Sequence, residues 1–549
     1  MIKTFNVIKK IIVRQFYYKK FENHNIKVFN KFKNLNNEKS KSKILIEFNA
    51  FCVEHIGFSY LINSLKKKNN SKLESYFSHT ILSYPLRRTL NMKINFFLGK
   101  LFKIKNFGIY NSFGITKFNF PEIKIEHQNK AKKIYNNFLK KNNTREKILK
   151  FKIDNILFGD LLYDSFLKKN YDLKPTIFLD DVKFIKFSYD FILYLVIWID
   201  YFKKNDVKAV VGSHSVYSIG APLRIAIYKN IETFVINSEN LCRLTKKNPL
   251  QYREFYTYNK DFKKINLAKQ KKGISIAKKK LIARLDGKFS PDYHYATKSP
   301  FRKIKFGGNT IIKKSNKIKL VIATHDFVDA PHQLGECFFP DFYQWLLFFG
   351  KLSKKTNYDW YIKTHIPYGG KFEIYQPHEI NVVKEFTKDY PNFKIIPAKI
   401  TFPEIIASKI DAILTVNGTV GSEIPYYGIP VINASLNNPH INYNFNIHPK
   451  NKIELEKIIK NFAQYKKKIK ISKDEIFEHY FMKNIYYDKN WLFENHNKLI
   501  NDIGYHDQWT YKVYKYWMKK FSLKKHSELV LRIDKFVNSN KYRLRTSEY

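Results

Sequence analysis

The segment TVNGTVGSEIPYYGIPVIN, residues 415–433, decides the fold. The apolar run before it, residues 410–416, suits a buried parallel strand, and residues 417–419 then turn the chain so that backbone N–H groups at a helix start face outward. Glu423 follows, and Gly428 ends the helix before a second strand. The pattern predicts a phosphate-holding loop and a carboxylate that can accept hydrogen bonds from two vicinal sugar hydroxyls.

The spacing from Glu423 to Gly428-Ile429-Pro430-Val431 resembles the nucleotide-sugar loop of GT-B glycosyltransferases, in which the Glu binds the donor ribose. The asparagine, the small-residue loop and the Glu are similar to those of bacterial capsule and surface-polysaccharide synthesis proteins, including the Kdo transferases that build capsule anchors. In the alternative interpretation, Gly428 and Pro430 only mark the end of the helix in a βαβ unit, and Glu423 is a solvated helix residue.

Length and composition suit a large globular protein. The chain has 549 residues, of which 44% are hydrophobic, enough for two or more domains with ample core. Its formal net charge of +52 raises nucleic acid or an anionic membrane as a partner. A/T-rich codons would also produce the excess of lysine, and no zinc-finger spacing, RNA-recognition signature or arginine-rich arm accompanies the charge. We therefore expect no nucleic-acid partner.

Cysteines and apolar runs bear on the cellular compartment. Cys52, Cys242 and Cys337 lie far apart without a Cys-x-x-Cys, which predicts neither a disulfide framework nor a zinc site and fits a reducing cytoplasm. The longest apolar run, residues 191–199, has about half the length of a membrane-spanning helix, so we expect a buried helix there.

The basic N-terminus has no small-residue cleavage site after its apolar part, which disfavours a signal peptide. Phe5, Ile8, Ile12 and Phe16 recur at helical spacing among lysines. Two alternatives remain: a helix that lies on a membrane, or a basic helix that packs on the protein itself. The expected location is the cytoplasm, peripheral on the inner face of the cell membrane if the first alternative holds.

Periodicity and composition divide the chain into five parts. We expect a basic N-terminal segment (1–42), a Rossmann-like acceptor domain (43–250), a basic linker (251–315), a Rossmann-like nucleotide-sugar domain (316–470) and C-terminal helices (471–549). With the resemblance, the predicted fold class is α/β of GT-B type: two doubly wound domains that face each other across a cleft, with a helical C-terminal extension.

The N-terminal half offers three site candidates. Strands are expected over residues 43–49, 107–110, 208–212 and 231–237. The carboxyl ends of strands face the ligand crevice in a doubly wound sheet, so Glu54 and His55 after the first strand, and His214 after residues 208–212, are placed there. For His214, a histidine satisfied by local backbone is an equal alternative.

In the C-terminal half, a strand over residues 318–324 is followed by His325, Asp326, Asp329 and His332. Two histidines and two aspartates within eight residues suggest a metal site. We do not assign one, because metal ligands usually need a rigid spacing on one element, and GT-B enzymes as a group bind the donor without a bound metal. These four residues are interpreted as a substrate wall.

Another predicted strand ends at Lys363 and His365. It resembles the Lys-x-His-Pro element of capsule transferases, which is associated with the donor phosphate, although here Ile366 separates the histidine from Pro367. His440 follows a later strand and is assigned to the acceptor side of the cleft.

Together these features predict a metal-independent GT-B glycosyltransferase that builds a surface polysaccharide or glycolipid. Its substrates would be a CMP- or UDP-linked sugar, with no cofactor, and a glycan or glycolipid acceptor. The sites assigned are catalytic (His55, Asp326, His214), donor-binding (Lys363, His365, Asn417, Gly418, Thr419, Glu423) and acceptor or cleft (Glu54, His325, Asp329, His332, His440).

In this assignment Thr419 and Lys363 offset the charge of the leaving phosphate, and His55 or Asp326 deprotonates the acceptor. Two alternatives stay open. A nucleotide-sugar 2-epimerase uses the same fold and a similar loop, and a non-catalytic glycan- or nucleotide-binding protein would keep the fold without turnover.

Overall fold

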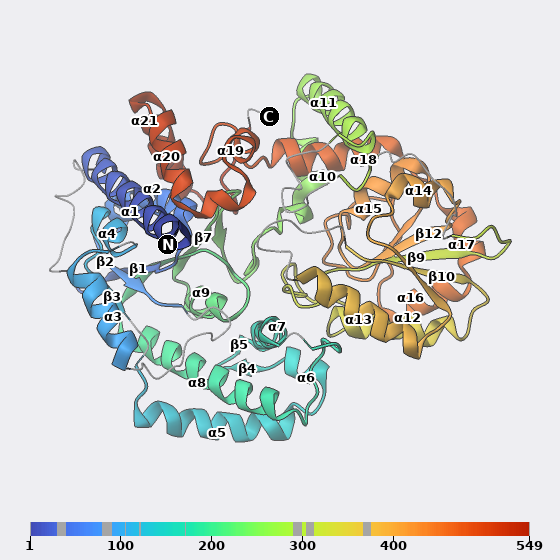
Figure 1. Ribbon diagram of the computed structural model, residues 1–549, viewed down its shortest axis with the longest axis horizontal. Helices are drawn as coiled ribbons and strands as arrows, with labels where there is room; N and C mark the ends of the chain where they lie inside the picture. The colour runs from blue at the N-terminus through green and yellow to red at the C-terminus, as the bar shows by residue number, and fades with distance from the viewer. Residues whose placement is uncertain are drawn as a thin grey trace. The chain divides into compact units, whose positions relative to one another are not determined.

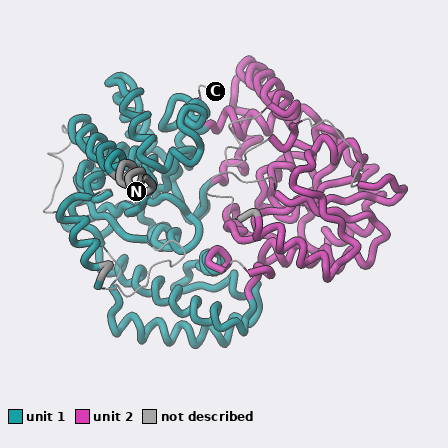
Figure 2. Tube along the Cα trace, in the orientation of Figure 1, with its two compact units in different colours: residues 1–166, 178–251, 489–544 teal, residues 167–177, 252–488, 545–549 magenta. Residues whose placement is uncertain are grey.

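The computed structural model describes residues 2–29, 40–78, 90–104, 106–119, 122–170, 172–288, 299–302, 312–365 and 375–547. The chain forms two compact units (Figure 2). Unit 1 comprises Met1–Phe166, Phe178–Gln251 and Lys489–Leu544, and unit 2 comprises Leu167–Ile177, Tyr252–Asp488 and Arg545–Tyr549.

Unit 1 contains a six-stranded sheet. Its strands are β1 (Lys43–Glu47), β2 (Lys72–Tyr76), β3 (Lys117–Asn119), β6 (Val207–Gly212), β7 (Glu232–Ile236) and β8 (Leu241–Leu244). The order is β3-β2-β1-β6-β7-β8, and only β8 is antiparallel to its neighbour. Chain order reverses between β1 and β6, so the ligand crevice of such a sheet opens at the carboxyl ends of these strands.

Helices cover both faces of this sheet, with α2 on one face and α8 and α9 on the other (Figure 1). A separate hairpin pairs β4 (Lys152–Ile153) with β5 (Ile156–Leu157). The helices up to residue 251 are α1 (Ile2–Phe29), α2 (Cys52–Asn69), α3 (Leu90–Leu101), α4 (Asn106–Ser112), α5 (Ile125–Lys141), α6 (Arg145–Leu149), α7 (Gly159–Lys169), α8 (Val182–Lys204) and α9 (Ala221–Tyr228).

The C-terminal helices α19 (His496–Ile503), α20 (Tyr511–Lys520) and α21 (Leu523–Val537) belong to unit 1. They share its core with α1 and α2: the rings of Phe21 and Tyr514 stack with centroids 4.1 Å apart, and Trp491 donates from Nε1 to the carbonyl of Asn237 at 3.0 Å. The core of the first unit is therefore completed by the last part of the chain.

Unit 2 contains a five-stranded, fully parallel sheet. Its strands are β9 (Lys319–Ala323), β10 (Asp359–Lys363), β11 (Phe393–Ile396), β12 (Ala412–Thr415) and β13 (Val431–Asn433). The order is β11-β10-β9-β12-β13, so the switch point lies between β9 and β12. Four of the strands, β9, β10, β12 and β13, were expected from their apolar runs. Most residues of all five strands are buried, as in a sheet covered on both faces.

The helices of unit 2 also lie on both faces of the sheet, with α12 and α13 on one side and α14 and α15 on the other (Figure 1). They are α10 (Tyr258–Lys263), α11 (Leu267–Leu285), α12 (Phe342–Ser353), α13 (Tyr375–Asp389), α14 (Phe402–Ala407), α15 (Val420–Glu423), α16 (Lys452–Lys460), α17 (Phe462–Lys468) and α18 (Lys473–Phe481). The 3-10 turn η7 (Ile424–Tyr427) continues α15 and ends at Gly428, whose φ of 76° favours glycine.

The prediction of a strand at residues 107–110 is wrong, because this stretch lies in α4. The second strand is β2, which the sequence analysis missed because its inward residue Glu74 is charged. Glu74 is satisfied there by Lys43 at 3.3 Å and Lys117 at 3.4 Å.

Residues 251–315 were expected to be a basic linker, but this range includes α10 and α11 of unit 2. In α11, Gly273 lies against the ring of Phe481, where a Cβ atom would be 2.7 Å from Cδ2. The small-residue turn expected at residues 306–309 lies outside the described residues.

The N-terminal helix α1 packs on the protein in its second half, where Phe21 and Phe29 are buried, while Ile12 and Phe16 are exposed. The side chains of Phe5 and Ile8 lie outside the description. The run 191–199 is a buried part of α8, as predicted. Over the described ranges, no helix combines the length and the apolar character needed to cross a membrane.

Candidate functional site

A cavity of ≈ 270 Å³ lies at the switch point of unit 2. The ends of β9, β10 and β12 and the loop after β12 contribute most of its wall. The lining residues are Arg284, Pro300, Ala323, Thr324, His325, Gln333, Lys363, Thr364, His365, Phe402, Thr415, Asn417, Gly418, Thr419, Val420 and Glu423. All six residues predicted to bind the donor are among them, together with His325.

The loop after β12 contains one hydrogen-bond donor that already has an acceptor and three that have none in the part of the chain that the structure describes. The N–H of Gly418 donates to Thr415 Oγ1 at 3.2 Å, and a Cβ atom on Gly418 would lie 2.7 Å from that oxygen, so the turn requires glycine. The N–H groups of Thr419 and Val420 have no acceptor among the described residues. Asn417 Nδ2 is also buried without a partner there. The loop therefore offers three donors to a ligand.

His325 is held as a neutral donor. Its Nε2 accepts the N–H of Val416 at 3.2 Å, so the ring proton resides on Nδ1. Phe342 stacks on the ring with centroids 4.5 Å apart. Burial lowers the pKa of His325 to about 3, so the ring stays neutral and can donate one hydrogen bond from Nδ1.

Lys363 supplies a buried cation. The side chain is only 3% exposed, and its Nζ donates to the carbonyls of Thr364 and Ala398, each at 3.2 Å. No carboxylate forms a salt bridge with it in the described part of the chain. Burial lowers its pKa to about 8. Glu379 and Glu404 attract this ammonium without forming a salt bridge with it, so its burial is costly and an anion in the cavity would relieve that cost.

Glu423 is 2% exposed and pairs with Arg284 of α11, which is equally buried. Arg284 donates from Nε to Oε1 at 2.6 Å, and its NH2 lies 2.6 Å from the same oxygen. The interpretation of Glu423 as a solvated helix residue is therefore wrong. The sequence analysis missed Arg284 because it stands in a lysine-rich stretch, although the apolar residues of that stretch recur at helical spacing.

Glu379 of α13 is a second buried carboxyl that the sequence analysis missed. It accepts hydrogen bonds from Thr324 Oγ1 at 2.5 Å and from the N–H of His365 at 2.9 Å, which ties together the ends of β9 and β10. Burial raises its pKa to about 7. Its Oε2 is buried and has no partner in the described residues.

The residues predicted as a substrate wall separate in the structure. Asp326 is half-buried next to His325, and burial, with a smaller contribution from Asp329, raises its pKa to about 6. Asp329 is exposed and pairs with Lys168 at 2.9 Å, while His332 is buried. Of these four residues only His325 lines the cavity, so Asp326, Asp329 and His332 do not form the predicted wall, although Asp326 directly follows His325 in the chain.

His440 was predicted to face the acceptor, and this is wrong because it is fully buried. It lies against α15, the helix that follows the loop after β12, and a Cβ atom on Gly421 would collide with its ring. His479 lies beside it, with ring centroids 5.0 Å apart. A strand-end position placed His440 correctly near the loop, but packing turns it into the core.

In unit 1, His55 and Glu54 are 0% and 1% exposed. His55 bonds through Nδ1 to the hydroxyl of Tyr514 at 2.6 Å and through Nε2 to the carbonyl of Asn49 at 3.2 Å. Asn49 Nδ2 donates to Glu54 at 2.7 Å. Burial lowers the pKa of His55 to about 4. Because the C-terminal helix α20 closes over it, the geometry does not support His55 as a base or Glu54 as a cleft residue.

Glu47, the last residue of β1, occupies the switch point of unit 1. It accepts the N–H of Ser213 at 2.6 Å and the hydroxyl of Ser78 at 2.8 Å, joining the ends of three strands. His214 follows Ser213, is half-buried and bonds to the Ser213 hydroxyl at 2.9 Å. The sequence analysis treated Glu47 only as part of a strand.

Three potential metal ligands gather at one place in the described residues, at Glu126, His127 and Asp200. Their bonds argue against an ion. His127 Nδ1 accepts the N–H of Lys124 at 3.3 Å, so its Nε2 carries the proton and donates to Asp200 at 3.1 Å. Lys204 already neutralises Asp200 at 2.9 Å. This cluster is an ion-pair network.

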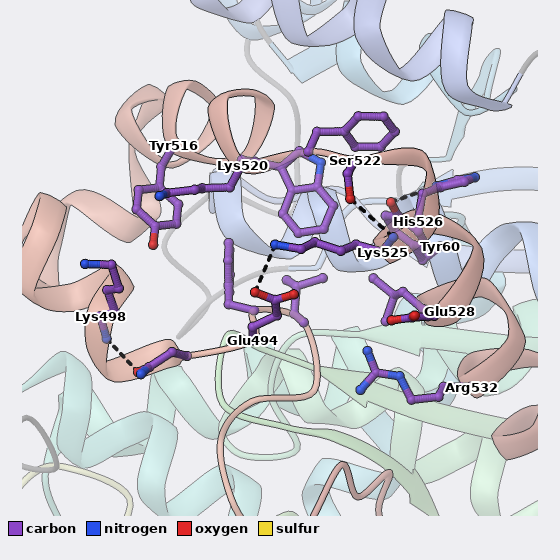
Figure 3. A pocket seen from close by; sticks show the side chains of 16 residues that line it. Tyr60, Glu494, Lys498, Tyr516, Lys520, Ser522, Lys525, His526, Glu528 and Arg532 are labelled. Carbon is purple, nitrogen blue, oxygen red and sulfur yellow. Dashed lines mark hydrogen bonds and ion pairs between the residues drawn. The ribbon is translucent and has the colours of Figure 1, made fainter.

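Unit 1 has a second cavity, of ≈ 220 Å³, between α2 and the C-terminal helices (Figure 3). Its walls mix Lys498, Lys520, Lys525 and Arg532 with acidic and aromatic side chains. Figure 3 shows the ammonium of Lys525 directed at Glu494, 2.9 Å away. No lining residue follows a strand end, so this cavity lacks the switch-point features of the cavity in unit 2.

No protein-family model and no curated protein matches the chain. Similar solved structures include the UDP-GlcNAc 2-epimerase from Neisseria meningitidis bound to UDP-GlcNAc, with 11% identity over 80% of this chain and 97% of that chain and a TM-score of 0.23. KpsC of Thermosulfurimonas dismutans, a beta Kdo 2,4 transferase, has 14% identity over 50% and 79%, with a TM-score of 0.31. MurG of Acinetobacter baumannii has 8% identity over 84% and 100%, with a TM-score of 0.22.

These likenesses are distant, so the fold class rests on the topology of the sheets. Both units are doubly wound α/β folds built on parallel strands, as the sequence predicted. Two Rossmann-like units in one chain are the composition of the GT-B class.

Proposed function

We propose that this chain is a GT-B glycosyltransferase that binds a nucleotide-activated sugar in the unit 2 cavity and transfers the sugar to a surface polysaccharide or glycolipid. The observation that supports this most is Lys363, a buried cation with no carboxylate partner among the described residues, at the switch point of a doubly wound sheet. Ligands of such sheets bind at this point, and a phosphate would supply the missing negative charge.

The cavity offers matching groups for the rest of a nucleotide sugar. The free N–H groups of Thr419 and Val420 and the Nδ1 proton of His325 are neutral donors for phosphate oxygens, and they do not depend on a metal ion. Glu423, held in place by Arg284, is positioned to accept hydrogen bonds from the ribose hydroxyls. The donor is a CMP- or UDP-linked sugar, and no cofactor is needed.

Asp326 is the preferred base for the acceptor hydroxyl. A carboxyl whose pKa is raised to about 6 is still ionised at neutral pH and is a stronger base than an ordinary carboxylate. His214 of unit 1 is the second choice because it is half-buried. The acceptor is a glycan or glycolipid at the cytoplasmic face of the cell membrane, which the enzyme meets as a peripheral protein.

The test is a thermal-shift panel of CMP, UDP, GDP and CDP and their sugars. A bound nucleotide at about 100 times its dissociation constant should add roughly 2.7 kcal/mol to the stability of unit 2. If no nucleotide stabilises the protein, the proposal fails. Conversion of a nucleotide sugar without an acceptor would favour an epimerase, and binding without turnover would favour a non-catalytic binding protein.

A further inference from the structure

Helix α3 of unit 1 presents an uncovered apolar face. Leu90, Ile94, Phe97, Leu98 and Leu101 are between 40% and 74% exposed. Phe102 and Ile104, directly after the helix, are 65% and 41% exposed. Seven large apolar side chains are thus exposed within fifteen residues, whereas single exposed apolar residues are normal elsewhere on a protein surface.

The five helical residues share one side of α3. At about 100° per residue they fall within an arc of about 100°, which is the stripe of an amphipathic helix. The opposite side holds the helix on unit 1: Phe96 packs on Phe107 with ring centroids 5.1 Å apart, and a Cβ atom on Gly99 would lie 2.7 Å from the Phe107 ring. The packing against α4 therefore directs the apolar stripe into solvent.

The charged residues within the segment 90–104 are all of one sign. Lys93, Lys100 and Lys103 are exposed, and residues 90–104 contain no Asp or Glu. At 12 residues α3 is about 18 Å long, which suits a helix lying in the plane of a membrane surface. A second copy of the chain on this face would bring both sets of lysines together, and their repulsion opposes such a dimer.

We propose that α3 is a membrane-docking helix that inserts its apolar stripe into the interface of an anionic lipid bilayer, with Lys93, Lys100 and Lys103 contacting the phosphate headgroups. This assigns the contact to α3 and not to the N-terminal residues suggested by sequence. It does not depend on nucleotide binding, so vesicle binding and the nucleotide panel can fail separately.

The experiment measures co-sedimentation of the full-length protein with vesicles of phosphatidylcholine, with and without phosphatidylglycerol. Wild type should bind the anionic vesicles preferentially. The double variant Phe97→Ser/Leu101→Ser should bind them at least about tenfold more weakly, because two side chains no longer enter the apolar layer. Each of Lys93→Gln and Lys100→Gln should weaken binding about fivefold, and more salt should weaken wild-type binding.

Matched variants keep the test specific. Ile453→Ser with Leu523→Ser removes two apolar side chains of 80% and 75% exposure, and Lys467→Gln with Lys468→Gln removes two exposed charges. Both pairs should bind vesicles like wild type, and all variants should keep the wild-type melting temperature. Equal binding by wild type and Phe97→Ser/Leu101→Ser overturns the proposal. So does a wild-type oligomer that this double variant converts to a monomer, because a second copy would then cover α3.

Discussion

Lys363 should lower the stability of the ligand-free protein and strengthen the binding of a nucleotide. Keeping an unpaired ammonium buried destabilises the apo protein, whereas a bound phosphate would use the same charge. Lys363→Met fills a similar volume without the charge. We expect it to melt at the same temperature or higher, yet to bind nucleotide about 10- to 150-fold more weakly through loss of a charge-assisted hydrogen bond.

Calorimetric titration and thermal melting measure the two quantities. Lys319→Met is the matched control, since Lys319 is also buried but begins β9 at the other end of the strand. It should leave nucleotide affinity unchanged. An unaltered affinity in Lys363→Met would remove Lys363 from the donor site.

The pH dependence of Lys363 has a defined sign. Its pKa is about 8 in the folded protein against an ordinary value of 10.5, so between these values the unfolded chain binds more protons. The free energy of unfolding of the apo protein should therefore rise as pH increases from 8 to 10.5. Nucleotide affinity should fall over the same range, approaching tenfold per pH unit, because the ammonium is lost. Denaturant melts and nucleotide titrations between pH 8 and 10.5 measure the two trends. In Lys363→Met, both the rise in unfolding free energy and the fall in affinity should be absent.

Glu423→Gln tests the ribose contact. It should weaken nucleotide binding by about 1.5 to 3 kcal/mol, and it should also lower the melting temperature because Arg284 loses its partner. Asp160→Asn separates the effects, since Asp160 pairs with buried Arg224 of unit 1 at 2.8 Å. This control should lose stability but keep its affinity. Equal nucleotide affinity in wild type and Glu423→Gln would refute the ribose contact.

At the scale of an element, the short helix α15 packs near three uncharged histidines, of which His440 and His479 are buried and His448 is half-buried. His440 lies against Gly421, His479 against His440, and His448 bonds to the carbonyl of Tyr443 at 3.2 Å. Burial lowers the pKa of His479 to about 3 and that of His448 to about 4. The charge of Lys483 further lowers the pKa of His440 and His479, and Glu478 acts on the neighbouring Tyr443. The packing of α15, and with it the position of the loop after β12, therefore depends on imidazoles that stay neutral.

Acidic pH should destabilise unit 2 through these histidines. Below pH 6.5 the unfolded chain takes up protons that folded His448 and His479 do not, so the unfolding free energy of unit 2 should fall by about 1.4 kcal/mol per pH unit for each histidine. Denaturant melts between pH 6.5 and 4.5 measure the slope. His479→Gln should reduce the slope by one histidine's share, and an unchanged slope would contradict the assignment.

At the scale of the whole molecule, the chain forms two compact units, and the last helices complete the core of unit 1. Trp491 is 1% exposed, and its ring lies against Gly57 of α2. Trp491→Ala should destabilise unit 1 by about 3 to 5 kcal/mol through the cavity it leaves. Because every described residue that lines the switch-point cavity belongs to unit 2, the nucleotide affinity of the variant should be unchanged.

Scanning calorimetry with and without nucleotide measures this outcome. We expect Trp491→Ala to lower the melting temperature of the unit 1 transition, and nucleotide to raise that of the unit 2 transition. Trp360→Ala, which empties a buried position in β10, should instead lower the transition that nucleotide raises. A single transition that both changes shift together would contradict two independent cores.

The sequence by itself indicated four of the five strands of unit 2, namely β9, β10, β12 and β13, whereas the strand order and the switch point came from the structure. Each of those four strands contains an apolar run, and the carboxyl ends of parallel strands lie at one edge of a sheet. With the resemblance to the nucleotide-sugar loop and the Lys-x-His-Pro element, Lys363, His365, Asn417, Gly418, Thr419 and Glu423 were assigned to one site, and all six line the same cavity.

Only the tertiary structure decided which polar residues remain available to a ligand. Arg284 reaches Glu423 from a helix 139 residues earlier in the chain, and Tyr514 closes over His55 from a helix 459 residues later. Sequence periodicity identifies the face of an element but not the distant segment that packs on it. Glu54 and His55 were expected in the loop after the first strand but lie in the first turn of α2, and His440 follows β13 in the chain; long-range packing buries all three.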